Sequence, residues 1–184
     1  MAERKKVLID DCNLKPSAVL LPLFVKDGRC HIVFTKRTNH LANHKGEISF
    51  PGGGRHKKDR SFLETALRES YEEIGLKQSD VEILGELDDT STIRSSYCIV
   101  PFVGTIPYPY YFKQDAFEVE EIFDLPIDKI LKAKTTTGLF TIEGITYDTQ
   151  VYEVGDRLIW GATARILAGF FEVLGSVSGA HCIS

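Results

Sequence analysis

The stretch that decides the fold is Gly54–Leu76, which reads GRHKKDRSFLETALRESYEEIGL. From Ser61 its apolar residues recur with the helical period of about 3.6 residues, and Gly75 stands where a helix C-cap is expected. Directly before it, Gly52–Gly54 is a run of glycines, which contribute no side-chain packing and cost backbone entropy when ordered. The sequence therefore predicts a glycine loop that leads into an amphipathic helix.

Glutamates gather on one side of this helix. At about 100° per residue, Glu69 and Glu73 lie about 40° apart, and Glu72 lies about 100° from Glu73. Like charges this close destabilise an exposed helix by about 0.2–0.5 kcal/mol per pair, and a hard divalent cation removes that repulsion. The alternative is a solvated acidic face on which Arg68 pairs with Glu72. The adjacent glycine loop favours a metal site, since a bare backbone can approach a metal and phosphates closely.

The composition is that of one globular domain. Its 184 residues, 43% hydrophobic and 26% charged, suffice for one core and are too few for a multi-domain machine. A net charge of −4 provides no basic field for nucleic acid or an anionic membrane. The longest apolar run, Ala18–Val25, is far shorter than the ~20 residues that cross a bilayer. The expected domain covers residues 1–184, with its core at about 18–174 and a loose tail at 175–184.

The cysteines lie far apart in the sequence, at Cys12, Cys30, Cys98 and Cys182. No C-x-x-C pair or tight Cys/His cluster indicates a zinc site or a disulfide scaffold. The N-terminus lacks the apolar region of a secretory signal. Reduced thiols and a cytoplasmic location are therefore expected.

Outside the helix, β-branched and aromatic runs alternate with turn residues. Residues 18–25 and 31–36 flank Asp27 and Gly28, a pattern typical of a hairpin. Further strands are expected at 81–87, 97–105, 139–142 and 146–154, and further helices at 126–131 and about 161–174. This succession predicts an α/β fold in which helices cover a mixed sheet.

The segment Arg68–Leu76, with Gly54 fourteen positions before the arginine, resembles the Nudix box, G-x5-E-x7-R-E-U-x-E-E-x-G-U. The spacing matches throughout, and two residues differ. Arg60 stands at the first glutamate of the box, and Ser70 stands at the usually aliphatic position after Arg-Glu. The principal metal-binding glutamates of the family lie in the R-E-x-x-E-E part, which is intact, so the resemblance implies retained activity.

Upstream, Thr35–Gly53 is similar to the signature of Nudix coenzyme A pyrophosphatases, with T-x-R, a leucine, H-x-G and F-P-G-G. Ala42 stands where one version of the signature has arginine. Glu118–Pro126 and Ile159–Ala164 also look like segments of that subfamily. The resemblance implies a Nudix fold, an α/β/α sandwich, that hydrolyses coenzyme A or acyl-CoA with Mg²⁺ or Mn²⁺. The expected products are 3′,5′-ADP and 4′-phosphopantetheine or its acyl form. A small nucleotide is then the partner, and a homodimer is compatible with the family.

The resemblance also implies roles for individual residues. The residues expected to be catalytic are Glu69, Glu72, Glu73 and Arg68. The metal is expected on Glu69, Glu73, Glu72 and Gly53. The substrate is expected to contact Arg37, Gly52, Gly53, Gly54 and Arg55. Asp59 or Glu64 could supply the acid that Arg60 replaces, and the candidates for a ligand from another element are Glu118, Glu120 and Glu121.

Alternatives stay open on the sequence alone. The substrate could instead be ADP-ribose, NADH or a dinucleotide polyphosphate. Arg60 raises a further alternative, a module that senses nucleotides and has lost catalysis. Tyr108, Tyr110, Tyr111 and Phe112 form an aromatic segment that either stacks adenine, packs locally or forms a subunit interface.

Overall fold

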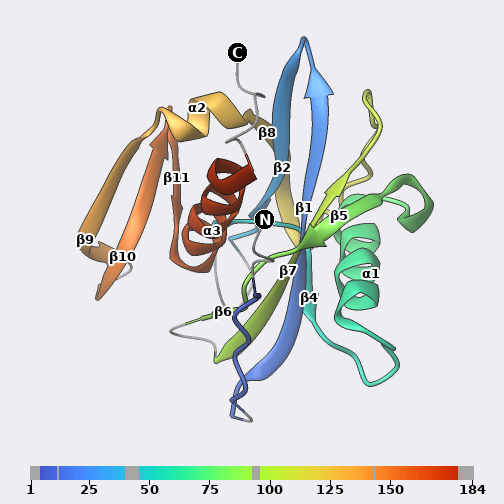
Figure 1. The fold of residues 1–184 in the computed structure, drawn as a ribbon, viewed down its shortest axis with the longest axis horizontal. Coiled ribbons are helices and arrows are strands. Elements are labelled where there is room, and N and C mark those ends of the chain that lie inside the picture. The colour runs from blue at the N-terminus through green and yellow to red at the C-terminus, as the bar shows by residue number, and fades with distance from the viewer. Residues whose placement is uncertain (1–4, 12, 40–45, 93–95, 143, 178–184) are drawn as a thin grey trace.

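The predicted hairpin is present at the centre of the molecule. Strand β1 (Lys15–Lys26) turns directly into β2 (Arg29–Arg37), and Asp27 and Gly28 have φ of 51° and 74°. Two consecutive positive φ angles are those of a type I′ turn, which the Asp-Gly pair favours. The computed structural model describes residues 5–11, 13–39, 46–92, 96–142 and 144–177 (Figure 1).

A mixed sheet is built around this hairpin. Strands β1 and β7 (Tyr97–Thr105) are parallel, and the other paired strands of this sheet are antiparallel. The path through the sheet runs β3–β2–β1–β7–β5, while β4 pairs with β1, β6 with β7, and β8 with β2. The remaining strands are β3 (Ile48–Ser49), β4 (Gly52–Gly54), β5 (Glu82–Glu86), β6 (Thr90–Ser91) and β8 (Val119–Pro126).

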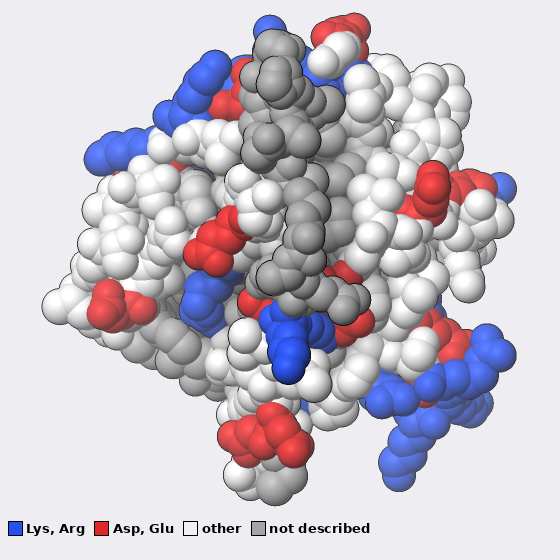
Figure 2. Space-filling view, in the orientation of Figure 1, with Lys and Arg blue, Asp and Glu red and all other residues white. Residues whose placement is uncertain are grey.

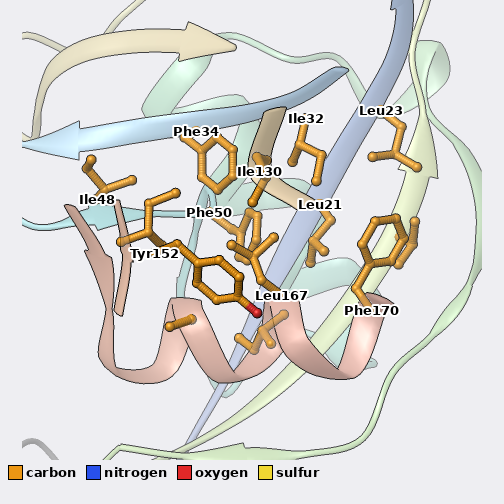
Figure 3. Packing of buried hydrophobic residues seen from close by; sticks show 14 of the residues in the cluster. Leu21, Leu23, Ile32, Phe34, Ile48, Phe50, Ile130, Tyr152, Leu167 and Phe170 are labelled. Atoms are coloured by element: carbon orange, nitrogen blue, oxygen red, sulfur yellow. The ribbon is translucent and has the colours of Figure 1, made fainter. Parts of the chain in front are cut away.

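Helices cover both faces of this sheet, as the sequence predicts. Helix α1 (Phe62–Ile74) packs on one face in a hydrophobic cluster that includes Leu20 and Phe24 of β1. Helix α3 (Gly161–Val177) packs on the other face in a cluster that includes Leu21 of β1 (Figure 3). Because β1 is buried on both sides, its sequence is a nearly continuous apolar run rather than an alternating one.

A second, antiparallel sheet follows the short helix α2 (Ile127–Leu131). It consists of β9 (Lys134–Ile142), β10 (Ile145–Val154) and β11 (Arg157–Trp160). The guanidinium of Arg157 lies 3.6 Å from the ring centroid of Phe123 and donates to both carboxylate oxygens of Glu121, at 2.9 and 2.7 Å. These contacts tie β11 to β8, two strands that the sequence patterns do not predict.

The glycine run forms a short strand, which corrects the expected loop. Gly52–Gly54 pairs antiparallel with Val19, Ala18 and Ser17 of β1. A Cβ at Gly52 would lie 2.4 Å from the carbonyl oxygen of Ala18, and its φ of 156° disfavours other residues. Gly52 is required because a Cβ there would meet the backbone of β1, whereas a Cβ at Gly53 would meet the Glu69 side chain of α1. The ladder hydrogen bonds with β1 offset the entropic cost of the glycines.

Helix α1 has the predicted ends. The Ser61 side chain accepts a hydrogen bond from the Glu64 N–H at the N-cap, and Gly75 closes the helix with a φ of 68°. Some predictions fall outside the described residues: the loop 40–45 with Ala42 and His44, the tail from residue 178, Cys12 and Cys182. Within the ranges given above, no helix is long and apolar enough to span a membrane.

Candidate functional site

The carboxylates of Glu69 and Glu73 on α1 face the backbone of β4. The N–H of Gly52 donates to Oε2 of Glu73 over 3.1 Å. A Cβ at Gly53 would lie 2.6 Å from the carboxylate carbon of Glu69. The glycine strand thus lets two acidic side chains approach the main chain, so the structure brings together these predicted residues.

Glu73 is a buried carboxyl with incomplete charge compensation. Glu73 is 3% exposed. Burial raises the pKa of its carboxyl to about 8, although the Gly52 N–H and Arg37 act to lower this pKa. Nη1 of Arg37 lies 3.5 Å from Oε1 of Glu73, as expected for a residue at the site. Burial also raises the pKa of Glu69, although Arg68 opposes this shift. A nearby cation would therefore stabilise the ionised form of both acids.

Arg68 joins the carboxylates to the start of the helix. Its Nη1 donates to Glu69 Oε1 and Glu72 Oε2, each over 2.9 Å, and its Nη2 donates to the Gly54 carbonyl over 3.1 Å. The Arg68–Glu72 pair expected for a solvated acidic face is thus present, but the same guanidinium also reaches the half-buried Glu69. Arg68 thus holds neighbouring glutamates in place, and the catalytic role expected of it stays a prediction.

Asp59, the residue before Arg60, pairs with Arg68. Nε and Nη2 of Arg68 donate to its two carboxylate oxygens over 3.1 and 3.0 Å. The N–H of His56 and the hydroxyl of Thr65 also donate to Oδ2 of Asp59, each over 2.9 Å. The hydrogen bonds from Arg68 hold the pKa of Asp59 well below its usual range. Of the two residues predicted to replace the missing acid, Asp59 is the one that pairs with Arg68, and its part in the reaction stays a prediction.

Glu64, the other predicted substitute, pairs instead with Arg60. Its Oε2 accepts from the backbone N–H and from Nε of Arg60, the latter over 3.1 Å. The Arg60 side chain is 88% exposed, so this pair lies at the surface. An exposed pair of this kind contributes little to stability.

One of the acidic residues around β8 lies near the same carboxylates. The negative charge of Glu118 contributes to the raised pKa values of Glu69 and Glu73. Glu120 accepts from Lys36 over 2.8 Å, and Glu121 is held by the arginine of β11 described above. Glu118 thus differs from the other two candidates in that its charge acts on Glu69 and Glu73, whereas Glu120 and Glu121 have cationic partners elsewhere.

A basic loop joins β4 to α1, and Figure 2 shows its basic side chains grouped at the lower right. Its exposed basic residues are Arg55, His56, Lys57, Lys58 and Arg60. The guanidinium of Arg55 lies 4.8 Å from the ring centroid of Phe62 and donates to the Asp59 carbonyl over 3.2 Å. These contacts fix Arg55 within the loop and at the start of α1, and its role in binding substrate stays a prediction.

The donor set suits a hard divalent cation. Mg²⁺ is commonly held by one or two carboxylates together with waters and substrate phosphates. Glu69 and Glu73 provide such a pair, and burial leaves their charge poorly compensated. Among the residues that the structure describes, no three Asp, Glu, His or Cys side chains converge as a complete metal cage. Arg68 holds Glu69 and Glu72 by hydrogen bonds to its guanidinium.

Comparison with known proteins assigns the family. The sequence model of the NUDIX domain matches residues 14–136. This chain belongs to the NUDIX domain family. A Photorhabdus laumondii protein named as an uncharacterized Nudix hydrolase, NudL, is 33% identical over 156 residues, which cover 84% of this chain and 82% of the relative. An Enterobacter protein of the same name is 31% identical over 166 residues, 89% of this chain and 85% of that protein.

Solved structures of other proteins share the fold of this chain. A binary complex of the Caenorhabditis elegans Ap4A hydrolase aligns with a TM-score of 0.60 and 11% identity, over 90% of this chain and 99% of that one. The Nudix hydrolase RenU of M. smegmatis aligns with a TM-score of 0.58 and 12% identity, over 92% and 89%. The chain is thus a Nudix hydrolase, which acts on phosphoanhydride bonds, and such enzymes generally use divalent metal ions.

Replacing Asp59 tests its role as the partner of Arg68. Asp59→Asn should lower the free energy of unfolding by about 1–3 kcal/mol, because a mostly buried arginine loses a charged acceptor. Urea denaturation of both proteins at neutral pH measures this change. Glu64→Gln is the matched control and should leave the midpoint unchanged, since its pair with Arg60 lies at the surface. Equal effects of the two substitutions would contradict the assignment.

Replacing Gly53 tests the close approach of β4 to the acids. In Gly53→Ala the new methyl group would displace the Glu69 carboxylate, and a displacement of about 1 Å costs roughly 100-fold in kcat. Gly54→Ala is the matched comparison, because a Cβ there would meet only a ring carbon of Tyr97 at 4.0 Å. Steady-state hydrolysis should be at least about tenfold faster in Gly54→Ala than in Gly53→Ala. Similar rates in the two variants would show that the contact with Glu69 is unimportant.

Proposed function

We propose that this chain is a divalent-metal-dependent pyrophosphohydrolase that cleaves the diphosphate of coenzyme A or acyl-CoA. The products would be 3′,5′-ADP and 4′-phosphopantetheine or its acyl form. The observation that carries the reaction type is the pair of carboxylates, the buried Glu73 and the half-buried Glu69, set against the backbone of β4. Acids beside a main chain that carries no side chains provide ligands for a metal and a surface that phosphate oxygens can approach.

The metal would be Mg²⁺ or Mn²⁺, held by Glu69, Glu73 and the carbonyl of Gly53. Glu72 would complete the site or bridge to a second ion. When bound, the ion would polarise a phosphoryl oxygen and lower the pKa of a water. Arg68 would orient Glu69 and Glu72, whose carboxylates it already holds at 2.9 Å.

Arg37 would bind the diphosphate beside the metal. Its Nε is buried and has no hydrogen-bond partner within the described residues, while its Nη1 lies beside Glu73. A guanidinium suits phosphate because its N–H groups match two oxygens at once. Gly52, Gly53 and Gly54 would contact the substrate from the side of β4.

Glu118 would add a carboxylate from outside α1. Its backbone position is fixed by Thr38, whose N–H donates to the Glu118 carbonyl over 3.0 Å. Its charge already acts on Glu69 and Glu73. We assign to Glu118 a role at the metal or at the water that attacks the diphosphate.

The choice of coenzyme A rests on the signature upstream of the box. Its described parts lie around the acids: the Thr35 hydroxyl contacts Ser49, Arg37 lies beside Glu73, and the F-P-G-G segment leads into β4. Coenzyme A is strongly anionic, with a diphosphate and a 3′-phosphate. A chain with a net charge of −4 needs local cations to bind it, and Arg37 with the basic loop 55–60 supplies them.

Mass spectrometry of the products tests the reaction and the substrate together. Coenzyme A incubated with the protein and millimolar Mg²⁺ should yield 3′,5′-ADP and 4′-phosphopantetheine. Glu73→Gln should abolish turnover and keep the fold, as circular dichroism would show. Parallel incubations with ADP-ribose, NADH and Ap4A identify the substrate if coenzyme A is inert. Full activity of Glu73→Gln would refute the metal site, and nucleotide binding without any cleavage would favour a sensing module.

Substitution of the acids around β8 tests the assignment of Glu118. Glu118→Gln should lower kcat by about 10–1,000-fold, the range expected when a group that acts on the transition state is removed. Glu120→Gln is the matched control, because Glu120 pairs with Lys36 at the surface. Steady-state rates at saturating Mg²⁺ measure both. The assignment fails if Glu120→Gln loses as much activity as Glu118→Gln.

A further inference from the structure

The last turn of helix α1 is held by the chain segment that follows β7. The hydroxyl of Tyr110 accepts from the N–H of Lys77 over 2.9 Å and donates to Asp80 over 3.0 Å. The Tyr110 ring also lies 5.0 Å from that of Phe112. These contacts favour the local packing alternative for the aromatic segment, and they support α1 just beyond its last residue.

The same segment continues into hydrogen bonds with the main chain of the helix. The N–H of Lys113 donates to the Ile74 carbonyl, and the N–H of Asp115 donates to the Glu73 carbonyl, each over 2.9 Å. The last carbonyls of a helix have no partner within it, so these two N–H groups complete the end of α1. Asp115 is therefore joined to the residue that carries one of the two candidate metal-binding acids.

The side chain of Asp115 shapes the turn that leads into β8. Its Oδ1 accepts from the N–H groups of Phe117 and Glu118, over 2.8 and 3.2 Å. Its backbone carbonyl accepts from the N–H of Val119 over 2.9 Å. An aspartate that accepts from the N–H two residues further on forms an Asx turn, which asparagine forms as well. One carboxylate oxygen thus fixes the backbone at Glu118.

The backbone of Glu118 is also placed from its other side. The N–H of Thr38 donates to the Glu118 carbonyl over 3.0 Å. Thr38 follows Arg37, which lies opposite Val119 in the β2–β8 ladder and whose Nη1 is 3.5 Å from Oε1 of Glu73. Strand β8 also lies close to α1. Glu118 is therefore held between two segments that each contact Glu73, one through its carbonyl and one through its carboxylate.

We propose that Asp115 is a positioning residue that holds Glu118 beside the acids of α1, an inference that rests on the proposed function. Without the carboxylate of Asp115, the N–H groups of Phe117 and Glu118 lose their acceptor and the turn shifts. A displacement of about 1 Å costs roughly 100-fold in rate when it moves a group that acts in the reaction. Asp115 acts through Glu118 and takes no part in the chemical step.

Kinetics of Asp115 variants provide the first test. Asp115→Ala should lower kcat for coenzyme A by about 10–100-fold, the range for partners that orient the ligands of a metal site. Its KM should stay within about threefold of the wild type, because the loss falls on the transition state. Asp115→Asn should restore most of the rate, since an amide oxygen accepts the same two N–H groups. An unchanged kcat in Asp115→Ala, or an equal loss in both variants, would overturn the proposal.

Asp80→Ala is the matched control. Asp80 supports the end of α1 through Tyr110, whereas Asp115 contacts both the helix and the Glu118 turn. The kcat of Asp80→Ala should therefore stay within about twofold of the wild type. A loss as large as that of Asp115→Ala would show that any weakening of the helix end slows the reaction, and would refute a specific role for Asp115.

A double-mutant cycle with Glu118→Gln separates positioning from general support. In the Glu118→Gln background, Asp115→Ala should change kcat by less than about twofold, because the carboxylate that it positions is already absent. If Asp115→Ala causes its full loss again in that background, Asp115 acts elsewhere and the proposal is wrong.

Amide hydrogen exchange followed by NMR tests the turn without any turnover. Protection of the Phe117 and Glu118 amides should fall at least about tenfold in Asp115→Ala, the factor for a lost hydrogen bond to a charged group. Asp115→Asn and Asp80→Ala should keep this protection. Unchanged protection in Asp115→Ala would overturn the turn as the device that places Glu118. A wild type that cleaves no diphosphate would instead remove the proposed function, whatever the exchange shows.

Discussion

The candidate site depends on the hydrogen bonds that the guanidinium of Arg68 donates. It contacts Asp59, the Gly54 carbonyl, Glu69 and Glu72, and so joins the loop before α1, the end of β4 and two carboxylates of the helix. One cation among three acids leaves negative charge in excess. A site with this balance attracts a divalent ion, whereas a fully paired cluster would not.

The second constraint is the distance between β4 and its neighbours. The strand lies between β1 and the acidic face of α1, and a Cβ at Gly52 or Gly53 would meet atoms on one side or the other. The burial of β1 on both faces holds the sheet in place beneath α1. Packing in the core thus determines how closely the carboxylates approach the backbone that faces them.

Local signals make much of this structure predictable. The Asp27-Gly28 turn, the helix from Ser61 to Gly75 and the closing helix each follow from a pattern within a few residues. Strand pairing is not local. Gly52–Gly54 has no strand propensity, and its strand exists because β1 offers it hydrogen bonds. Strand β8 escapes prediction because its charged residues find partners on other strands, such as Arg157 for Glu121.

The site shows the same division between local and tertiary information. Helical periodicity alone places Glu69 and Glu73 on one face of α1. Periodicity cannot separate Glu118 from Glu120, because the two residues differ in their partners on other strands. Lys36 pairs with Glu120, and the sequence gap between them is 84 residues. Distant pairs of this kind have no signature in a single sequence.

The departure from the Nudix box at Arg60 shows why position alone is a poor guide to function. In this chain the buried acid that pairs with Arg68 is Asp59. A turn in which the Asp59 N–H donates to the His56 carbonyl brings the Asp59 carboxylate inward, one residue earlier than the motif requires. Arg60 is then free to point outward and pair with Glu64. The chain therefore lacks a glutamate at Arg60 but holds a buried carboxylate against Arg68, so the substitution by itself gives no reason to infer lost catalysis.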